Sequence, residues 1–173
     1  MRLLIRFADA ANEIAGRIAA WLSVALVAVV AGLVAARSMF DLGSIAVQEA
    51  VLWLHGALFL LALGFALKHG SHVRVDVFSQ RMSARTRARI ECAGIVLLLV
   101  PLCVFTLWIS YDYVAASWGQ REGSNSAGLP GWYLVKTLIP LSALLLLLQA
   151  VAELIRAWAR AHPEPEPEPE PEP

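Results

Sequence analysis

The residues best suited to chemistry lie in the stretch KHGSHVRVDVF, Lys68 to Phe78. His69, His72 and Asp76 have a spacing that suits a metal ion, because imidazole nitrogens and carboxylate oxygens are zinc ligands. No thiolate or further ligand lies nearby, so we predict no metal site. The same stretch is basic, as nucleic-acid-binding segments are. A loop that stays beside an anionic lipid surface is also basic, so the charge of this stretch does not require a nucleic acid as partner.

A second set of polar residues lies in and just before the apolar segment that precedes this stretch. Ser44, Gln48 and His55 are spaced by four and seven residues, so they share one face of a helix. Glu49 lies about 100° to one side of that face. Polar side chains are costly inside a membrane, so this face should meet protein and not lipid. We expect a packing or subunit interface; the alternative is a role in carrying protons or ions.

The last apolar segment carries a polar stripe. Its members recur at steps of four, three and four residues: Gln149, Glu153, Arg156 and Arg160. This spacing predicts one helix face with an ion pair between Glu153 and Arg156. Lys136 lies one turn inside the other end of the segment, from which its side chain can extend outward to the membrane boundary.

These residues form no recognised catalytic arrangement. His55 is the only histidine inside an apolar segment, whereas a haem held between membrane helices usually needs two axial ligands. The sequence also lacks a phosphate-binding glycine loop, a zinc-protease histidine pair, and a serine, histidine and aspartate set placed for catalysis. We therefore expect neither an enzyme nor a bound cofactor.

Composition indicates the environment in which these residues are held. Of the 173 residues, 58% are hydrophobic and only 16% are charged, against about 25% charged in soluble domains. The formal net charge is zero, but five of the 14 acidic residues are glutamates of the terminal Pro-Glu repeat. The rest of the chain is basic, as is typical of a membrane protein whose loops face an anionic leaflet.

Four segments are long and apolar enough to cross a hydrocarbon core of about 30 Å. None alternates like a barrel strand, so we predict an all-α integral membrane protein. Its transmembrane domain is predicted to span residues 18–157, with helices at about 18–36, 50–67, 92–111 and 132–155. The first could instead be a cleaved secretory signal, but its apolar run exceeds the usual 7–15 residues.

The predicted helices are flanked by distinct ends. Residues 1–17 carry charges at helical spacing, which predicts an amphipathic helix on the membrane surface. Residues 158–173 contain the Pro-Glu repeat and are predicted to be disordered. Ser83 is expected to cap the third helix. Pro101 and Pro140 are expected to bend the third and fourth helices.

The placement of lysine and arginine predicts the orientation. Four crossings put both termini on the same side as the loop between the second and third helices. That side has eleven basic residues: Arg2, Arg6, Arg17, Lys68, Arg74, Arg81, Arg85, Arg87, Arg89, Arg156 and Arg160. The other side has three: Arg37, Arg121 and Lys136. Cytoplasmic loops are enriched in such residues, so we predict that both termini are cytoplasmic.

Two blocks of the sequence resemble a known family. They are VQEAVLWLHGALFLLALGFALKHGSHVRVDVFSQRMSARTRARIE and SWGQREGSNSAGLPGWYLVKTLIPLSALLLLLQAVAELIRA. From about Ala46 to Ala157 the chain is similar to the small permease subunit of tripartite ATP-independent periplasmic (TRAP) transporters. The most specific elements are the run from His72 to Asp76, the Gln48-Glu49 pair, and Gly-Leu-Pro before the fourth helix.

The resemblance implies a multi-pass protein of the bacterial inner membrane with two protein partners. One is a large multi-spanning TRAP permease subunit that carries substrate and sodium by an elevator-type movement. The other is a soluble periplasmic substrate-binding protein that delivers an organic acid. The small subunit is implied to be a fixed scaffold without catalytic residues. Membrane lipids are its other expected partners.

We expect ten residues to serve subunit contacts or structure: Gln48, Glu49, His55, His72, Arg74, Asp76, Lys136, Gln149, Glu153 and Arg156. The main alternative function is a self-sufficient proton-coupled transporter that acts as a homo-oligomer. In that protein, Glu49 and His55 would handle protons. A haem-binding membrane anchor is a third alternative, which a single intramembrane histidine disfavours.

Overall fold

The computed structural model describes residues 2–70, 82–124 and 126–162. Helices account for nearly all of this part: α1 (Arg2–Phe40), α2 (Ile45–Lys68), α4 (Ala84–Gly94), the π-helical turn η1 (Ile95–Leu99), α5 (Val100–Gly119) and α6 (Trp132–Ala161). Because α4, η1 and α5 follow one another without a break, the described residues form four helical segments long and apolar enough to cross a membrane. The prediction of an all-α membrane protein is confirmed.

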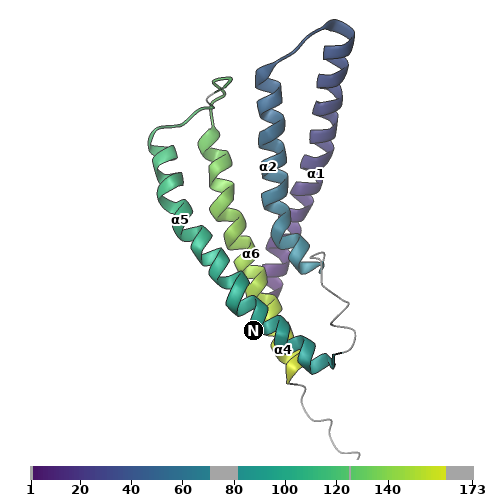
Figure 1. Ribbon diagram of the computed structural model, residues 1–173, viewed down its shortest axis with the longest axis vertical. Coiled ribbons are helices and arrows are strands. Elements are labelled where there is room, and N and C mark those ends of the chain that lie inside the picture. Colours follow the sequence, from purple (N-terminus) through teal and green to yellow (C-terminus); the bar gives the residue numbers. More distant parts are fainter. Residues whose placement is uncertain (1, 71–81, 125, 163–173) are drawn as a thin grey trace, which may run out of the picture.

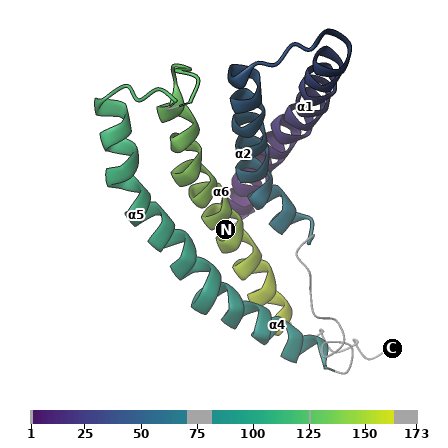
Figure 2. The ribbon, with the colours of Figure 1, turned by 45° about the horizontal axis from the view of Figure 1, so that its top comes forward.

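The helices are arranged as two antiparallel hairpins, α1 with α2 and α5 with α6 (Figure 1). The hairpins meet at the end that holds α4, here called the α4 end. They spread apart toward the end that holds the connection between α5 and α6, here called the loop end (Figure 2). Helix α2 packs along α6, and the start of α1 also packs on α6. Helix α6 therefore contacts every other helix.

Local sequence explains where two of the helices begin. The Ser44 hydroxyl accepts a hydrogen bond from the Val47 backbone N–H at 3.4 Å, and Ser83 accepts one from Thr86 at 3.2 Å. A serine at this position satisfies a backbone donor that the first helical turn leaves without a partner. The predicted cap at Ser83 is confirmed, whereas Ser44 precedes its helix and does not belong to the face it was predicted to share with Gln48.

Helix α1 passes through residue 17 without interruption, so the predicted lead is the first part of a 39-residue helix. Leu3 and Phe7 on this part are 85% and 63% exposed, whereas Ala8 and Asn12 are fully buried. The face with Ala8 and Asn12 therefore packs on the rest of the protein, and the face with Leu3 and Phe7 points away from it. That the lead lies along the membrane surface stays a prediction.

A π-helical turn interrupts the regular helix beside Pro101. The Val100 backbone N–H bonds to the Ile95 carbonyl oxygen, a span of five residues. Proline has no N–H and its ring clashes with the carbonyl four residues earlier, so a helix must adjust in the turn before it. The wider turn provides that adjustment, and Figure 2 shows α4 and α5 joined along one curved path.

Small residues form most of the interior. The buried apolar residues are nearly all alanines, which include Ala8, Ala150, Ala152 and Ala157 at 0% exposure. Large apolar side chains point outward instead, with Trp21 and Trp108 more than 70% exposed. Membrane helices associate through close backbone approach at small residues, because lipid gives no hydrophobic driving force between them.

Gly64 of α2 is one such close approach. A Cβ atom at this position would overlap the side-chain amide of Asn12 and lie 3.3 Å from the Leu145 carbonyl oxygen. We therefore expect Gly64→Ala to separate α2 from α1 and α6 and to lower stability by about 1–3 kcal/mol, the usual range for overpacking. The measurement is the melting temperature of the full-length chain in detergent.

Gly56→Ala in the same helix is the matched control, since no atom lies within 4 Å of the added Cβ. It should melt at or above the temperature of the unmodified chain, because alanine favours helix over glycine. Equal melting temperatures for the two variants would contradict the assigned packing.

Candidate functional site

A hydrogen-bonded network joins α1 to α6 near the α4 end. Its two central amides, Asn12 and Gln149, are both 0% exposed. Asn12 Nδ2 donates to Gln149 Oε1 at 3.0 Å and to the Leu145 carbonyl oxygen at 3.1 Å. Gln149 Nε2 in turn donates to Asp9 Oδ1 at 3.1 Å and to Glu153 Oε1 at 3.2 Å. These four bonds cross between helices or follow the predicted polar stripe of α6, and Asn12 Nδ2 also donates to the Ala8 carbonyl oxygen of α1 at 3.0 Å.

Arg156 completes this network, which we call the Asp9–Arg156 network (Asp9, Asn12, Gln149, Glu153 and Arg156). Its guanidinium donates to Glu153 Oε1 at 2.5 Å and also to Asp9 Oδ2. The predicted pair between Glu153 and Arg156 is therefore present. The second carboxylate, from Asp9, was missed; its only sign in the sequence was its place among the charges of the lead.

Two further ion pairs hold α2 and α4 at the same end. Lys68 at the end of α2 donates to Glu13 Oε2 at 2.7 Å and to the Asp9 carbonyl oxygen at 3.3 Å. Arg160 of α6 donates to Glu91 of α4 at 2.9 Å. Each carboxylate thus accepts from a cation, an arrangement that matches charge and fixes helix positions.

Glu49 holds a loop of its own chain at the loop end. Its Oε2 atom accepts hydrogen bonds from Ser124 Oγ at 2.6 Å and from the Ala127 backbone N–H at 3.1 Å. Ser124 Oγ also accepts from the Leu129 N–H at 2.9 Å. The carboxylate therefore fastens the connection between α5 and α6 to the start of α2.

Lys136 lies under the same connection and is only 7% exposed. Its ammonium group donates to Glu122 Oε2 at 2.5 Å and lies 4.0 Å from the centre of the Tyr113 ring. Ser117 Oγ donates to the same Glu122 oxygen at 2.6 Å. The predicted outward extension of Lys136 therefore ends in an ion pair. The hydrogen bond from Lys136 lowers the pKa of the Glu122 carboxyl below its ordinary value.

Gln48 and His55 are exposed, whereas the other predicted site residues within the described ranges are buried or half-buried. Neither side chain has a hydrogen bond or ion pair with any described residue. They share an outward face of α2 with Leu52 and Phe59, which are 69% and 58% exposed. We call Gln48, Leu52, His55 and Phe59 the α2 outer face. The predicted polar face exists, but it points away from the other described helices.

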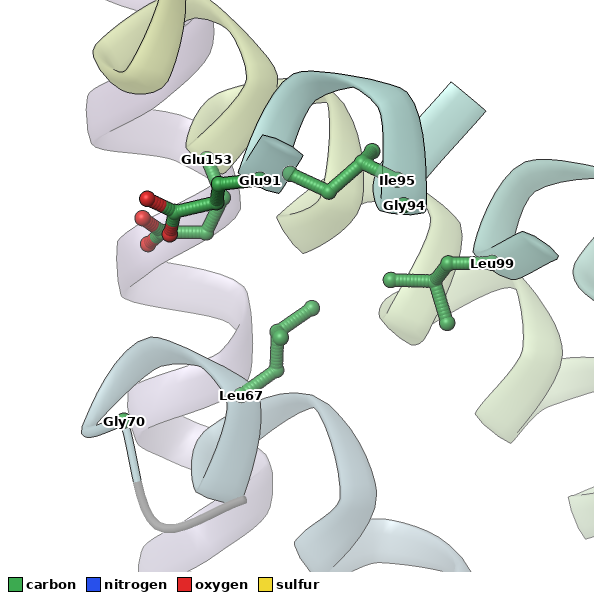
Figure 3. Close-up of a pocket in the computed structure, with 7 residues that line it drawn as sticks. All are labelled: Leu67, Gly70, Glu91, Gly94, Ile95, Leu99 and Glu153. Carbon is green, nitrogen blue, oxygen red and sulfur yellow. The ribbon is translucent and has the colours of Figure 1, made fainter. Parts of the chain in front are cut away.

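A pocket of about 210 Å³ lies among the end of α2, the α4–η1 segment and α6. Figure 3 shows Glu91 and Glu153 at one end of it, with Leu67, Ile95 and Leu99 around the rest. Both carboxylates are already paired with arginines. The volume is also below the roughly 300–1,000 Å³ of usual ligand sites.

Within the described ranges, no three histidine, cysteine or acidic side chains are grouped to hold a metal ion. His72, Arg74 and Asp76 of the opening motif lie outside these ranges. Their predicted roles in subunit contacts stay predictions.

Asp9→Ala should destabilise the chain, because Arg156 and Gln149 each lose a hydrogen-bond partner in a largely buried network. We expect a loss of about 1–3 kcal/mol, visible as a lower melting temperature of the full-length chain in detergent. Asp112→Ala is the matched control, since Asp112 is exposed and has no ion pair with a described residue. Equal effects of the two changes would show that the Asp9–Arg156 network does not hold α1 to α6.

Acid should remove the stabilisation that the Glu122–Lys136 pair contributes. The pKa of Glu122 in the folded chain lies below its ordinary value of 4.5. The ion pair therefore contributes fully to stability when the pH is above the ordinary pKa of a glutamate. This contribution is lost as the pH falls through the lowered pKa of Glu122. The readout is the difference in melting temperature between the unmodified chain and Glu122→Gln, from about pH 7 to about pH 3. The difference should shrink with acid; a constant difference would contradict the pairing.

Comparison with known proteins agrees with this architecture. No curated protein matches the chain closely enough to report. Residues 26–160, which include α2 through nearly all of α6, match the family described as tripartite ATP-independent periplasmic transporters, DctQ component. The match covers more than half of the 173 residues. The chain belongs to this DctQ family and is a small permease subunit of a TRAP transporter in the inner membrane.

Proposed function

We propose that this subunit is a non-catalytic scaffold in a sodium-coupled importer of organic acids. Its α2 outer face binds the large permease subunit, which carries substrate and sodium. A periplasmic substrate-binding protein delivers the substrate to the assembled complex. Family membership supports the two partners, and the resemblance described above supports the sodium coupling and the substrate class.

The observation that carries the proposal is the exposure of Gln48 and His55 on the α2 outer face. His55 lies ten residues into α2, about 15 Å from its start, and so well inside the membrane. Lipid offers no hydrogen bond to an imidazole at that depth, and polar groups there usually face protein. A second subunit with complementary polar groups satisfies both side chains.

The other polar residues support a scaffold by the way they are used. Glu49, Lys136, Glu153 and Arg156 all bond within this chain. Their charges fix loops and helix ends, as the fixed part of a transporter requires. The excess of basic residues at the α4 end supports the proposal that this end and both termini are cytoplasmic.

His55→Leu and Gln48→Leu should weaken assembly with the large subunit. The loss of one hydrogen bond between membrane helices corresponds to about 0.6–2 kcal/mol, or about three-fold to thirty-fold in affinity. The isolated chain should melt as before, because neither side chain has a hydrogen bond or ion pair with a described residue. The measurements are the yield of copurified large subunit and uptake of substrate by the same preparation in proteoliposomes.

Thr106→Val on α5 is the control. It makes a similar polar-to-apolar change, but the Thr106 hydroxyl bonds to the Leu102 carbonyl oxygen of its own helix at 2.8 Å. It should leave the copurified yield unchanged. A stable His55→Leu complex that no longer transports would refute the scaffold role and favour proton transfer through His55.

A further inference from the structure

The α4–η1 segment and α6 lie side by side (Figure 2). An apolar groove with exposed lining residues lies between them. Its volume is about 470 Å³, and its walls include Cys92, Val96 and Leu97 on one side and Leu154 and Trp158 on the other. All of its lining residues are apolar apart from the thiol. It is distinct from the pocket of Figure 3, which lies on the inner side of the same helices.

One end of the groove carries positive charge. Arg89 lies three residues before Cys92, so it extends the wall of the groove by one turn toward the start of α4, and Arg85 lies one turn further. Both arginines are exposed and have no ion pair with a described residue. In contrast, Lys68, Arg156 and Arg160 at the α4 end are all paired with carboxylates.

The same end carries an aromatic residue suited to a membrane boundary. Trp158 is 61% exposed, and its ring stacks on His162 with 4.5 Å between the ring centres. Tryptophan is enriched where the hydrocarbon core meets the headgroups. The groove therefore extends from headgroup level into the hydrocarbon region, and its cations stand at the headgroup level.

We propose that the groove binds one anionic phospholipid, with an acyl chain between Val96 and Leu154 and the phosphate on Arg89. Arg85 stands one turn further out and adds a second positive charge. Apolar walls along the length with cations at one end match a molecule that has a single charged head and an apolar tail. A helix of the large subunit would also cover the apolar walls. It would pair with these arginines only if it carried an anionic group.

The test is native mass spectrometry of the delipidated full-length chain, titrated with phosphatidylglycerol or with phosphatidylcholine of the same acyl chains. We expect one tightly bound phosphatidylglycerol and weaker binding of phosphatidylcholine. Arg89→Gln should weaken phosphatidylglycerol binding about five-fold, the effect of one arginine near a charged headgroup. Arg2→Gln removes an exposed arginine of α1 and should change nothing.

Ala93→Phe tests the groove itself. Ala93 lines the groove and is exposed, so the larger ring fills the groove without entering the helix interior. It should weaken binding of both lipids, whereas Ala115→Phe, at an exposed position on α5, should not. Equal affinity for the two lipids, or full binding to Ala93→Phe, would overturn the proposal.

Cys92 provides a readout for the other possible occupant. It lines the groove, while Cys103, the other cysteine of the chain, is buried. In a Cys103→Ala background, phosphatidylglycerol should slow alkylation of Cys92 by a membrane-permeant maleimide, with or without the large subunit. Protection that requires the large subunit and is independent of lipid would identify the groove as a protein interface and refute the lipid site.

Discussion

The hydrogen bond between Asn12 and Gln149 lies where α1, α2 and α6 meet, and the arrangement of the helices depends on it. Both amides are fully buried, and Asn12 Oδ1 accepts no hydrogen bond from a described residue, so Asn12 is held by donation alone. The absence of a side chain at Gly64 leaves room for this amide. Two amides in an interior of alanines specify which helix faces meet, because any other rotation would expose them to lipid without partners.

Ion pairs between helices surround this hydrogen bond. The pair of Asp9 with Arg156 links α1 to α6, that of Glu13 with Lys68 links α1 to α2, and that of Glu91 with Arg160 links α4 to α6. All lie at the α4 end, whereas the loop end is held by Glu49 and by the pair of Glu122 with Lys136. Between the two hairpins, Asp9 and Arg156 form a polar link at the α4 end and Glu49 forms one at the loop end, where the helices are further apart.

The sequence predicted the four spans, the cap at Ser83 and the pair of Glu153 with Arg156, because each depends on neighbours within a few residues. Asp9 and Asn12 bond to α6 residues 133 to 147 positions away, and spacing along one helix does not reveal such partners. Charges at helical spacing look the same whether they face water or another helix, so the role of the lead in the network was missed. For the same reason, the polar face of α2 was recognised, but its spacing did not decide between packing within the chain and contact with another subunit.

The π-helical turn has a consequence for insertions and deletions. Buried residues of the third membrane segment recur seven residues apart before the turn, at Ala88 and Ile95, and after it, at Cys103 and Ser110. Across the turn, Ile95 and Cys103 are eight apart, and the wider turn absorbs the extra residue. Loss of one residue here would therefore restore regular helix and keep the facing of α5, whereas loss of one residue within the regular helix would rotate everything after it by about 100°. This short turn is therefore where the third membrane segment best tolerates a change in length, although its apolar composition resembles that of the regular helix around it.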